Sequence, residues 1–204
     1  LIIVVLASMT AWMLVRANNL PSKIIFSIFV ATMLIPFQTL MMPLMQEMGW
    51  IRDNLHIQML DNRLGLVYMY IGFGASMAVF LYHGFVKSIP IEIEEAAMID
   101  GCTPIQTFFK VVLPVMKPTC VTVAILETMW IWNDYLLPFL IIGNNDSKTL
   151  TLSLYYAKSL SGQYGNPWEL IFPAVLICVI PILIVFIFLQ RNIIEGIAAG
   201  AVKG

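Results

Sequence analysis

The chain has 204 residues, of which 60% are hydrophobic and only 11% are charged, and its mean hydropathy is +0.87. A soluble domain of this size needs far fewer apolar residues to fill its core, so we expect a membrane protein. The net charge of −1 excludes a basic field for nucleic acid, and the three cysteines, which form no CxxC pair, indicate neither a disulfide framework nor a metal site. We predict an all-α fold, a polytopic helix bundle in contact with membrane lipid.

Five apolar stretches are expected to cross the membrane within a single domain, residues 1–204. They are residues 1–15, 24–45, 64–82, 119–142 and 170–190. The last four approach or exceed the roughly 20 residues that a transmembrane helix needs, whereas the first is shorter. Because the chain starts inside this run, with Leu1 in place of a methionine, we interpret the first helix as truncated at its N-terminus.

The distribution of basic residues predicts the orientation. An odd number of spans places the two chain ends on opposite sides, and the side richer in Lys and Arg is cytoplasmic. The C-terminal tail, residues 191–204, is therefore expected inside, together with a loop at 87–117, while loops 46–63 and 143–169 lie outside. Seven basic residues fall inside (Arg16, Lys23, Lys87, Lys110, Lys117, Arg191, Lys203) and four outside (Arg52, Arg63, Lys148, Lys158).

The predicted cytoplasmic loop has the sequence of a helix, a turn and a second helix. Pro90, followed by Glu92 and Glu94, is typical of a helix start, and Gly101 is expected to end that helix. Thr103–Gln106 then has the pattern of a capping box, which predicts a second short helix.

The second loop helix should run to about Leu113, before Pro114. Its apolar residues recur at helical spacing, which predicts a face that lies against other protein or the membrane surface. These residues are Ile105, Phe108, Phe109 and Val112. A loop built in this way is a rigid body, not a flexible linker.

Polar residues in the fourth apolar stretch are candidates for a translocation path. An ionisable group inside a membrane is costly, so Glu127 is expected to face protein or water. Asp134 follows seven residues later on the same helical face, next to Asn133. In one interpretation the three line the path. In the other, Asp134 and Asn133 hold a structural bend, and Glu127 is protonated and bonded to a neighbouring helix.

The sequence carries no pattern for catalysis. It lacks the GxxxxGK[ST] loop that cradles ATP, as well as HExxH and GxSxG. No catalytic residue is therefore predicted. An ion-coupled secondary carrier remains an alternative, although it should show inverted repeats and paired charges at mid-membrane, and Glu127 alone resembles such a charge. A membrane enzyme would need converging acid, base or metal ligands, which the sequence does not suggest.

The loop sequence EEAAMIDGCTPIQTFFKVVLP resembles the EAA loop of binding-protein-dependent ABC importer permeases. The family pattern is Glu-Ala-Ala, three residues, Gly, nine residues, Ile, one residue and Leu-Pro, and Val111 in place of Ile is the one departure. Further landmarks resemble the carbohydrate-uptake branch, in particular permeases similar to the smaller subunit of the maltose transporter. These are SIPIEIEEAAMIDG, the WND at 132–134, the GQYG at 162–165 and the ending QRNIIEGIAAGAVKG.

The resemblance implies a permease subunit of an ATP-driven sugar importer, located in the cell membrane. Its loop would dock on a cytoplasmic ATP-binding-cassette ATPase dimer, which would hold ATP and Mg, and this chain would hold no cofactor. A second homologous permease and an extracytoplasmic sugar-binding protein would complete the assembly, with Gln163 and Tyr164 reaching toward the binding protein. The implied ATPase-coupling residues are Glu94, Glu95, Ala96, Ala97, Asp100, Gly101, Leu113 and Pro114.

The chemistry of this motif suits docking. Two small alanines on an exposed helix would let a partner groove close around the backbone, and Glu95 could accept a charge-assisted hydrogen bond from a partner Arg or Lys. Gly101 permits a sharp turn with positive φ, which we expect to be the tightest point of the loop.

Overall fold

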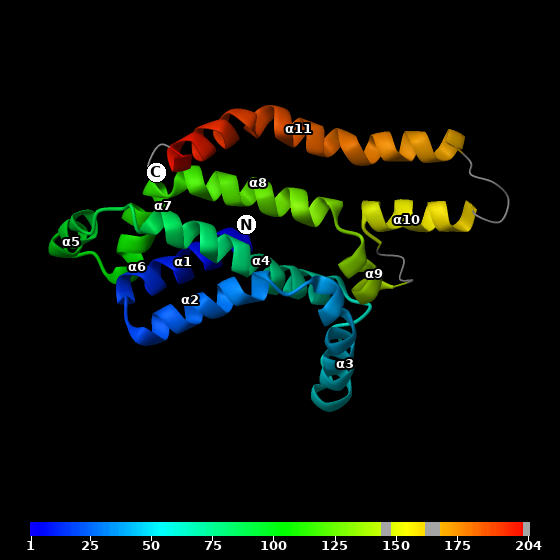
Figure 1. The fold of residues 1–204 in the computed structure, drawn as a ribbon, viewed down its shortest axis with the longest axis horizontal. Coiled ribbons are helices and arrows are strands. Elements are labelled where there is room, and N and C mark those ends of the chain that lie inside the picture. The colour runs from blue at the N-terminus through cyan, green and yellow to red at the C-terminus, as the bar shows by residue number, and fades with distance from the viewer. Residues whose placement is uncertain (144–147, 162–167, 202–204) are drawn as a thin grey trace. The chain divides into compact units, whose positions relative to one another are not determined.

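The computed structural model describes residues 1–143, 148–161 and 168–201, and every regular element in these ranges is helical. The all-α prediction is confirmed (Figure 1). The helices are α1 (Ile2–Ala17), α2 (Leu20–Met33), α3 (Phe37–Leu55), α4 (Arg63–Val86), α5 (Glu92–Ile99), α6 (Pro104–Thr107), η1 (Phe108–Val112), α7 (Leu113–Val115), α8 (Lys117–Asn133), α9 (Leu136–Ile142), α10 (Leu150–Ser161) and α11 (Trp168–Ala201).

Length and composition qualify two continuous segments among the described residues as membrane spans: Arg63–Val86, and Ile171–Phe188 within α11. Two pairs of shorter helices meet the same standard only when each pair is taken as one broken span. They are Leu20–Met33 with Phe37–Leu55, and Pro104–Val115 with Lys117–Asn133. The 16-residue α1 is apolar but shorter than a full span. A polytopic membrane protein is confirmed, with more interruptions than the sequence predicted.

The second apolar stretch, expected as one helix over 24–45, is interrupted between Met33 and Phe37. Pro36 precedes α3 in an extended conformation with φ −61° and ψ 133°, and a proline also disfavours helical geometry at the residue before it. Helix α3 then continues to Leu55. Most of the expected outer loop at 46–63 is therefore helical.

The fourth apolar stretch, expected over 119–142, is also divided, because α8 ends at Asn133 and α9 begins at Leu136. The Asp134 carboxylate accepts hydrogen bonds from the backbone N–H groups of Leu136 (3.0 Å) and Leu137 (3.4 Å), which satisfies donors at the start of α9. Beyond it, the expected outer loop 143–169 contains α10. The expected tail continues α11 as far as Ala201.

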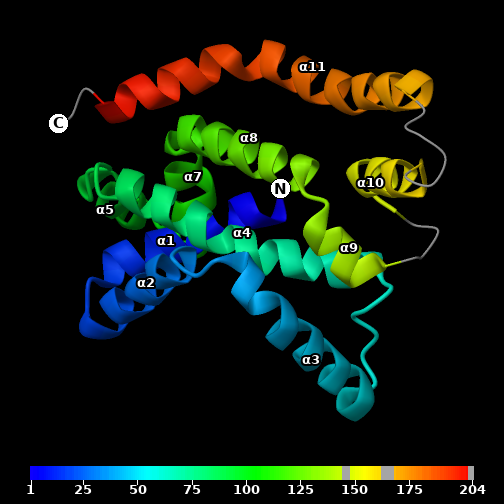
Figure 2. The same ribbon diagram turned by 45° about the vertical axis from the view of Figure 1, so that its right-hand side comes forward.

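The first of two compact units comprises residues 1–35, 71–127 and 191–204. Phe26 of α2 stacks on His83 of α4, with ring centroids 3.6 Å apart, and Thr32 shares a hydrogen bond of 2.8 Å with Ser76. Helices α5 and α6 lie beside the carboxyl end of α1 (Figures 1 and 2). The buried core of this unit includes Ala7, Ala11, Trp12, Ala78, Val79, Tyr82, Val86, Phe108, Val112, Met116, Val123 and Ile125.

The second compact unit comprises residues 36–70 and 128–190. Tyr70 donates a hydrogen bond to Asp134 (3.1 Å) and packs edge-on against Trp130, while the Trp132 indole donates to the carbonyl of Cys178 (2.9 Å). Its core includes Met48, Leu66, Met69, Tyr70, Leu137, Ile141, Ile142 and Leu152.

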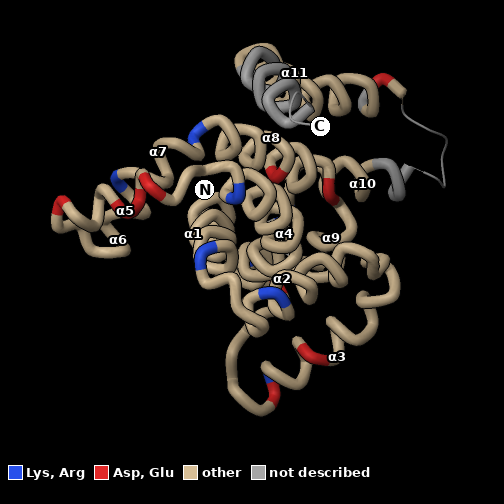
Figure 3. Tube along the Cα trace, turned by 60° about the vertical axis from the view of Figure 1, so that its left-hand side comes forward, with Lys and Arg blue, Asp and Glu red and all other residues tan. Residues whose placement is uncertain are grey.

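Charged side chains are sparse along the chain, and several acidic positions gather around α5 (Figure 3). By contrast, Ile171–Phe188 carries no charge, and none of this segment is buried. Large exposed apolar side chains on a helix of this length suit lipid or a second membrane subunit.

Candidate functional site

Helix α5 is defined by charge at its start and by a glycine turn at its end. Its first turn carries three glutamates, and the positive end of the helix dipole stabilises their negative charges. At the other end, the N–H of Cys102 donates to Ala97 O and that of Gly101 to Met98 O, both at 3.0 Å, which is the pattern of a Schellman motif. Gly101 has φ +85°, so the predicted positive φ is confirmed.

The Gly101 turn is not crowded within this chain. A Cβ atom at this position would meet no heavy atom of the described residues within 4 Å, so the chain itself leaves this point of the loop open. Glycine is favoured here because of the positive φ angle, which residues with a Cβ atom adopt only with strain.

The second loop helix begins with the predicted capping box. The Thr103 N–H donates to the Gln106 side chain (2.9 Å), and the Gln106 N–H donates to the Thr103 hydroxyl (3.3 Å). Pro104 takes the first helical position, where its missing N–H costs nothing. The start of this helix is confirmed at its predicted residues.

After Thr107 the helix widens into the π-helical segment η1, where the Leu113 N–H bonds back to the carbonyl of Phe108. Pro114 explains this change, because proline has no N–H and its ring clashes with the carbonyl four residues earlier. The segment Pro104–Val115 then meets α8 at 78°. Leu113 and Pro114 lie in α7, directly before this bend, which falls at Met116.

Within this chain the predicted apolar face divides into buried and exposed side chains. Phe108 and Val112 are fully buried, whereas Ile105 is 60% exposed and Phe109 is also exposed. The exposed side chains Ile105 and Phe109 remain open to the other protein or membrane surface that the prediction names. The buried positions follow a spacing of four, from Phe108 through Val112 to Met116.

The two faces of α5 separate the EAA residues. Glu94 and Ala97, three positions apart, are buried, whereas Glu95, Ala96 and Asp100 are exposed. The expectation that both alanines lie on an exposed surface is therefore wrong for Ala97. Glu94 likewise faces inward and contributes nothing to the outer surface of the loop.

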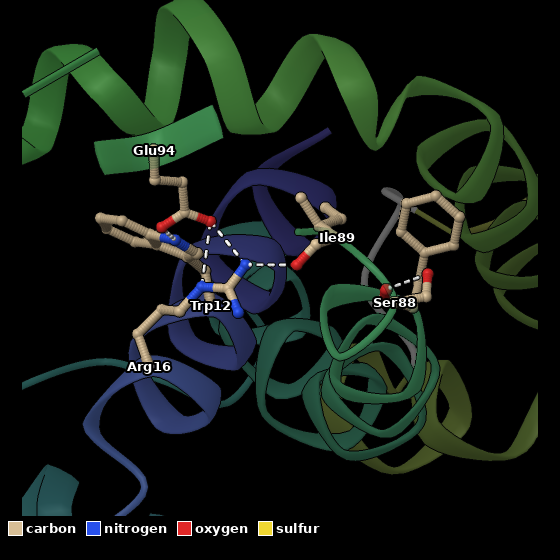
Figure 4. A network of polar contacts seen from close by, with 6 residues as sticks. Trp12, Arg16, Ser88, Ile89 and Glu94 are labelled. Atoms are coloured by element: carbon tan, nitrogen blue, oxygen red, sulfur yellow. Dashed lines mark hydrogen bonds and ion pairs between the residues drawn. The ribbon is translucent and has the colours of Figure 1, made fainter. Parts of the chain in front are cut away.

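The Glu94 carboxylate lies at the centre of a polar network (Figure 4). Its Oε1 atom accepts from Arg16 Nη2 (2.7 Å) and Nε (3.0 Å), and its Oε2 atom accepts from Trp12 Nε1 (2.9 Å). Arg16 Nη2 also donates to the carbonyl of Ile89 (3.0 Å). Glu94 is only 3% exposed, and three hydrogen bonds and the Arg16 guanidinium satisfy its carboxylate.

The outward surface of the loop carries a cluster of apolar side chains next to the exposed Glu95 and Asp100. Ile99, at the end of α5, is 86% exposed, and Ile105 and Met98 are also exposed. These side chains surround the Gly101 turn on a loop whose two helices are fixed by capping and by buried contacts. An exposed apolar cluster on a rigid element is typical of a surface that another protein covers.

Glu127 is 4% exposed, and neither of its oxygens has a hydrogen-bond partner among the residues that the structure describes. It packs against Gly74, where a Cβ atom would lie 2.5 Å from Glu127 Oε2. The absence of a side chain at Gly74 therefore leaves the space that the Glu127 carboxylate occupies. Among the described residues no hydrogen bond joins Glu127 to a neighbouring helix, as that alternative would require.

Asn133 and Asp134 lie at the break between α8 and α9. Asn133 donates to the carbonyl of Met129 (2.8 Å), and Asp134 bonds to Tyr70 and to the start of α9. Because α8 ends before Asp134, the expected continuous polar face with Glu127 does not extend to this residue. These contacts favour the interpretation of a structural bend.

Two further predicted residues, Gln163 and Tyr164, lie outside the described residues. Within the ranges that the structure covers, no three His, Cys, Asp or Glu side chains group as metal ligands would.

Sequence analysis missed Trp12 and Arg16 as site residues. Arg16 entered only as one of the basic residues that set the orientation, and Trp12 is 82 positions away from its partner Glu94. The one available signal was a basic residue in the last turn of the first apolar helix, followed much later by Glu94, which comes directly after Ile93.

Comparisons with known proteins agree over nearly the whole chain. Residues 3–198 match the family described as binding-protein-dependent transport system inner membrane component. The chain is 45% identical over 203 residues to a probable starch degradation products transport system permease protein of Thermoanaerobacterium thermosulfurigenes, covering 100% of this chain and 70% of that protein.

Two other relatives are also sugar-transport permeases by name. A multiple sugar-binding transport system permease protein of Streptococcus mutans is 36% identical over 89% of this chain and 62% of its own length. A melibiose/raffinose/stachyose import permease protein of Bacillus subtilis is 33% identical over 100% of this chain and 71% of its own. The chain thus spans between three fifths and three quarters of the length of these curated relatives.

Proposed function

Because the chain belongs to the family of binding-protein-dependent transport system inner membrane components, we propose that it couples ATP hydrolysis on a separate subunit to sugar import. Family membership makes the chain a transport permease component, not an enzyme, and excludes the alternative of an ion-coupled secondary carrier. An oligosaccharide is the proposed cargo, since relatives named for starch degradation products and for raffinose match all of this chain.

The observation that carries the coupling role is the exposed apolar surface of a rigid loop. Ile99, Met98 and Ile105 are exposed around the Gly101 turn, while Phe108 and Val112 fix the loop from within. Glu95 and Ala96 extend this surface. A cationic side chain of a partner can bind the Glu95 carboxylate, and the partner backbone can approach the small side chain of Ala96. We propose that the ATPase dimer docks on this surface.

The proposed assembly contains a second homologous permease, a cytoplasmic ATPase dimer that holds ATP and Mg, and an extracytoplasmic sugar-binding protein. Alternating access follows if closure of the ATPase dimer moves the loop as one body. Asp100 and Gly101 contribute by setting the angle between the two loop helices, and Leu113 with Pro114 by joining the second of them to α8 at a fixed bend.

The docking proposal is tested in the complete complex, by co-purification of the ATPase with an Ile99→Glu variant. A carboxylate on an apolar docking surface leaves a charge without a partner, so we expect most of the ATPase to be lost. Leu20→Glu is a matched control, since Leu20 is 72% exposed at the start of α2 and lies outside the loop. Normal ATPase recovery with Ile99→Glu would overturn the docking surface.

The cargo is tested by ATPase stimulation in proteoliposomes that contain the complete complex and its binding protein. Maltotriose and raffinose represent the two sugar classes named for the relatives. We expect one of them to raise the ATPase rate, with uptake of the same sugar. If neither did so, the assignment to these two sugar classes would be wrong.

The proposed orientation, with the C-terminus cytoplasmic, rests on the seven-to-four distribution of basic residues. Single cysteines at Asp53, in the outer segment after the Pro36 break, and at Ser88 are placed in a background without Cys102, Cys120 and Cys178. An impermeant maleimide should label intact cells at Asp53→Cys only. Labelling at Ser88→Cys instead would show the opposite orientation, with the loop outside the cytoplasm.

A further inference from the structure

Two turns at the carboxyl end of α1 contact both halves of the loop between α4 and α8. Arg16 and Trp12 hold Glu94 of α5 through three hydrogen bonds of 2.7 to 3.0 Å. The Trp12 ring also packs on Phe108 of η1, with centroids 5.4 Å apart. Trp12, Glu94 and Phe108 are all buried, so solvent does not compete for these contacts.

Arg16 has a second function in this geometry. The same Nη2 atom that binds Glu94 also donates to the carbonyl of Ile89, in the segment that leaves α4. One guanidinium thus fixes the segment before α5 and the helix itself (Figure 4). Its planar group suits this arrangement, since Nε and Nη2 reach the Glu94 carboxylate together, whereas a lysine offers one nitrogen.

We propose that Arg16 is a positioning residue that fastens the loop to α1, so that movement of α5 is delivered to the first membrane helix as well as along the chain to α4 and α8. This inference rests on the proposed coupling function. It assigns Glu94 to the inner attachment of the loop and leaves the outer face of α5 for docking. The ion pair suits this task, because Glu94 is 3% and Arg16 20% exposed, so separating them would leave both charges with little access to water.

The proposal is tested in proteoliposomes that contain the complete complex, by the ratio of sugar transported to ATP hydrolysed, with maltotriose or raffinose as the probe. Arg16→Gln should still bind the ATPase, while the ratio falls about threefold or more, the scale of changes in coupling between distant sites. The ratio should fall less in Arg16→Lys, because lysine keeps the positive charge. Lys23→Gln, which removes another basic residue on the same predicted side, should leave the ratio unchanged.

A charge exchange separates attachment from simple loss of fold. Arg16→Glu combined with Glu94→Arg restores an opposite pair, and part of the ratio should return relative to either single variant. If Arg16→Gln yields no complex, Trp12→Phe carries the test, because it keeps a ring against Phe108 and removes one bond to Glu94. A normal ratio in Arg16→Gln, or in Trp12→Phe where that variant is used, would overturn the proposal.

These outcomes are distinct from failure of the proposed function. If Ile99→Glu loses the ATPase while Arg16→Gln transports with a normal ratio, docking stands and the attachment through Arg16 is wrong. If Ile99→Glu keeps the ATPase and Arg16→Gln also keeps a normal ratio, both are wrong.

Discussion

Glu94 and Glu127 are two carboxylates buried to nearly the same extent, at 3% and 4% exposure, in very different surroundings. Glu94 accepts hydrogen bonds from Arg16 and Trp12, whereas neither oxygen of Glu127 has a partner among the described residues. Burial alone therefore does not distinguish a structural carboxylate from a functional one. The partners do: a satisfied buried charge fastens elements together, and an unsatisfied one is retained at a cost in stability.

The largest effect should follow from removing the satisfied carboxylate. Glu94→Leu leaves Arg16 without its counter-ion and Trp12 without its acceptor. We therefore expect the free energy of unfolding to fall by about 3 kcal/mol or more, as when one partner of a buried ion pair is removed. The midpoint of thermal denaturation in detergent, followed by size exclusion, measures this. Glu92→Leu, on the exposed side of the same helix, should cost less than about 1 kcal/mol. Equal effects of the two variants would mean that the network contributes little.

The next effect tests how closely Glu127 is enclosed. In Gly74→Ala the new Cβ would lie 2.5 Å from Glu127 Oε2 and 3.0 Å from Ile3 Cδ1, so the neighbours must shift, at a cost of about 1–3 kcal/mol. Gly72→Ala is the matched control, because its Cβ would meet nothing within 4 Å and alanine favours a helix. The same denaturation midpoint is compared. A Gly74→Ala protein as stable as Gly72→Ala would contradict the close packing.

A smaller effect is expected at the turn next to the fastened helix. Gly101→Ala forces a Cβ into φ +85°, which costs about 1–2 kcal/mol by strain although the space is open. Gly101→Asn should cost less, because asparagine tolerates positive φ. If the two variants denatured at the same temperature, the requirement for glycine would come from a docked partner and not from the backbone.

The smallest effect on stability should come from Glu127→Gln. The substitution keeps the shape and breaks no hydrogen bond among the described residues, so the free energy of unfolding should change by less than about 1.5 kcal/mol. If the carboxylate serves the transport path, sugar uptake should nevertheless fall while assembly and basal ATPase stay normal. Glu127→Leu controls for packing. Normal uptake in Glu127→Gln would remove this carboxylate from the mechanism.

Local patterns in the sequence determined the helical class, the Thr103–Gln106 capping box and the positive φ of Gly101, because each depends on residues a few positions apart. Composition determined that the chain belongs in a membrane, and the spacing of the EAA motif gave the transport family. Tertiary structure decided which side of α5 faces inward, because Glu94 and Glu95 differ only in their distant neighbours. It also placed Arg16 and Trp12 against a glutamate about 80 residues away, since hydrogen-bond partners so far apart in the chain meet only when the helices pack.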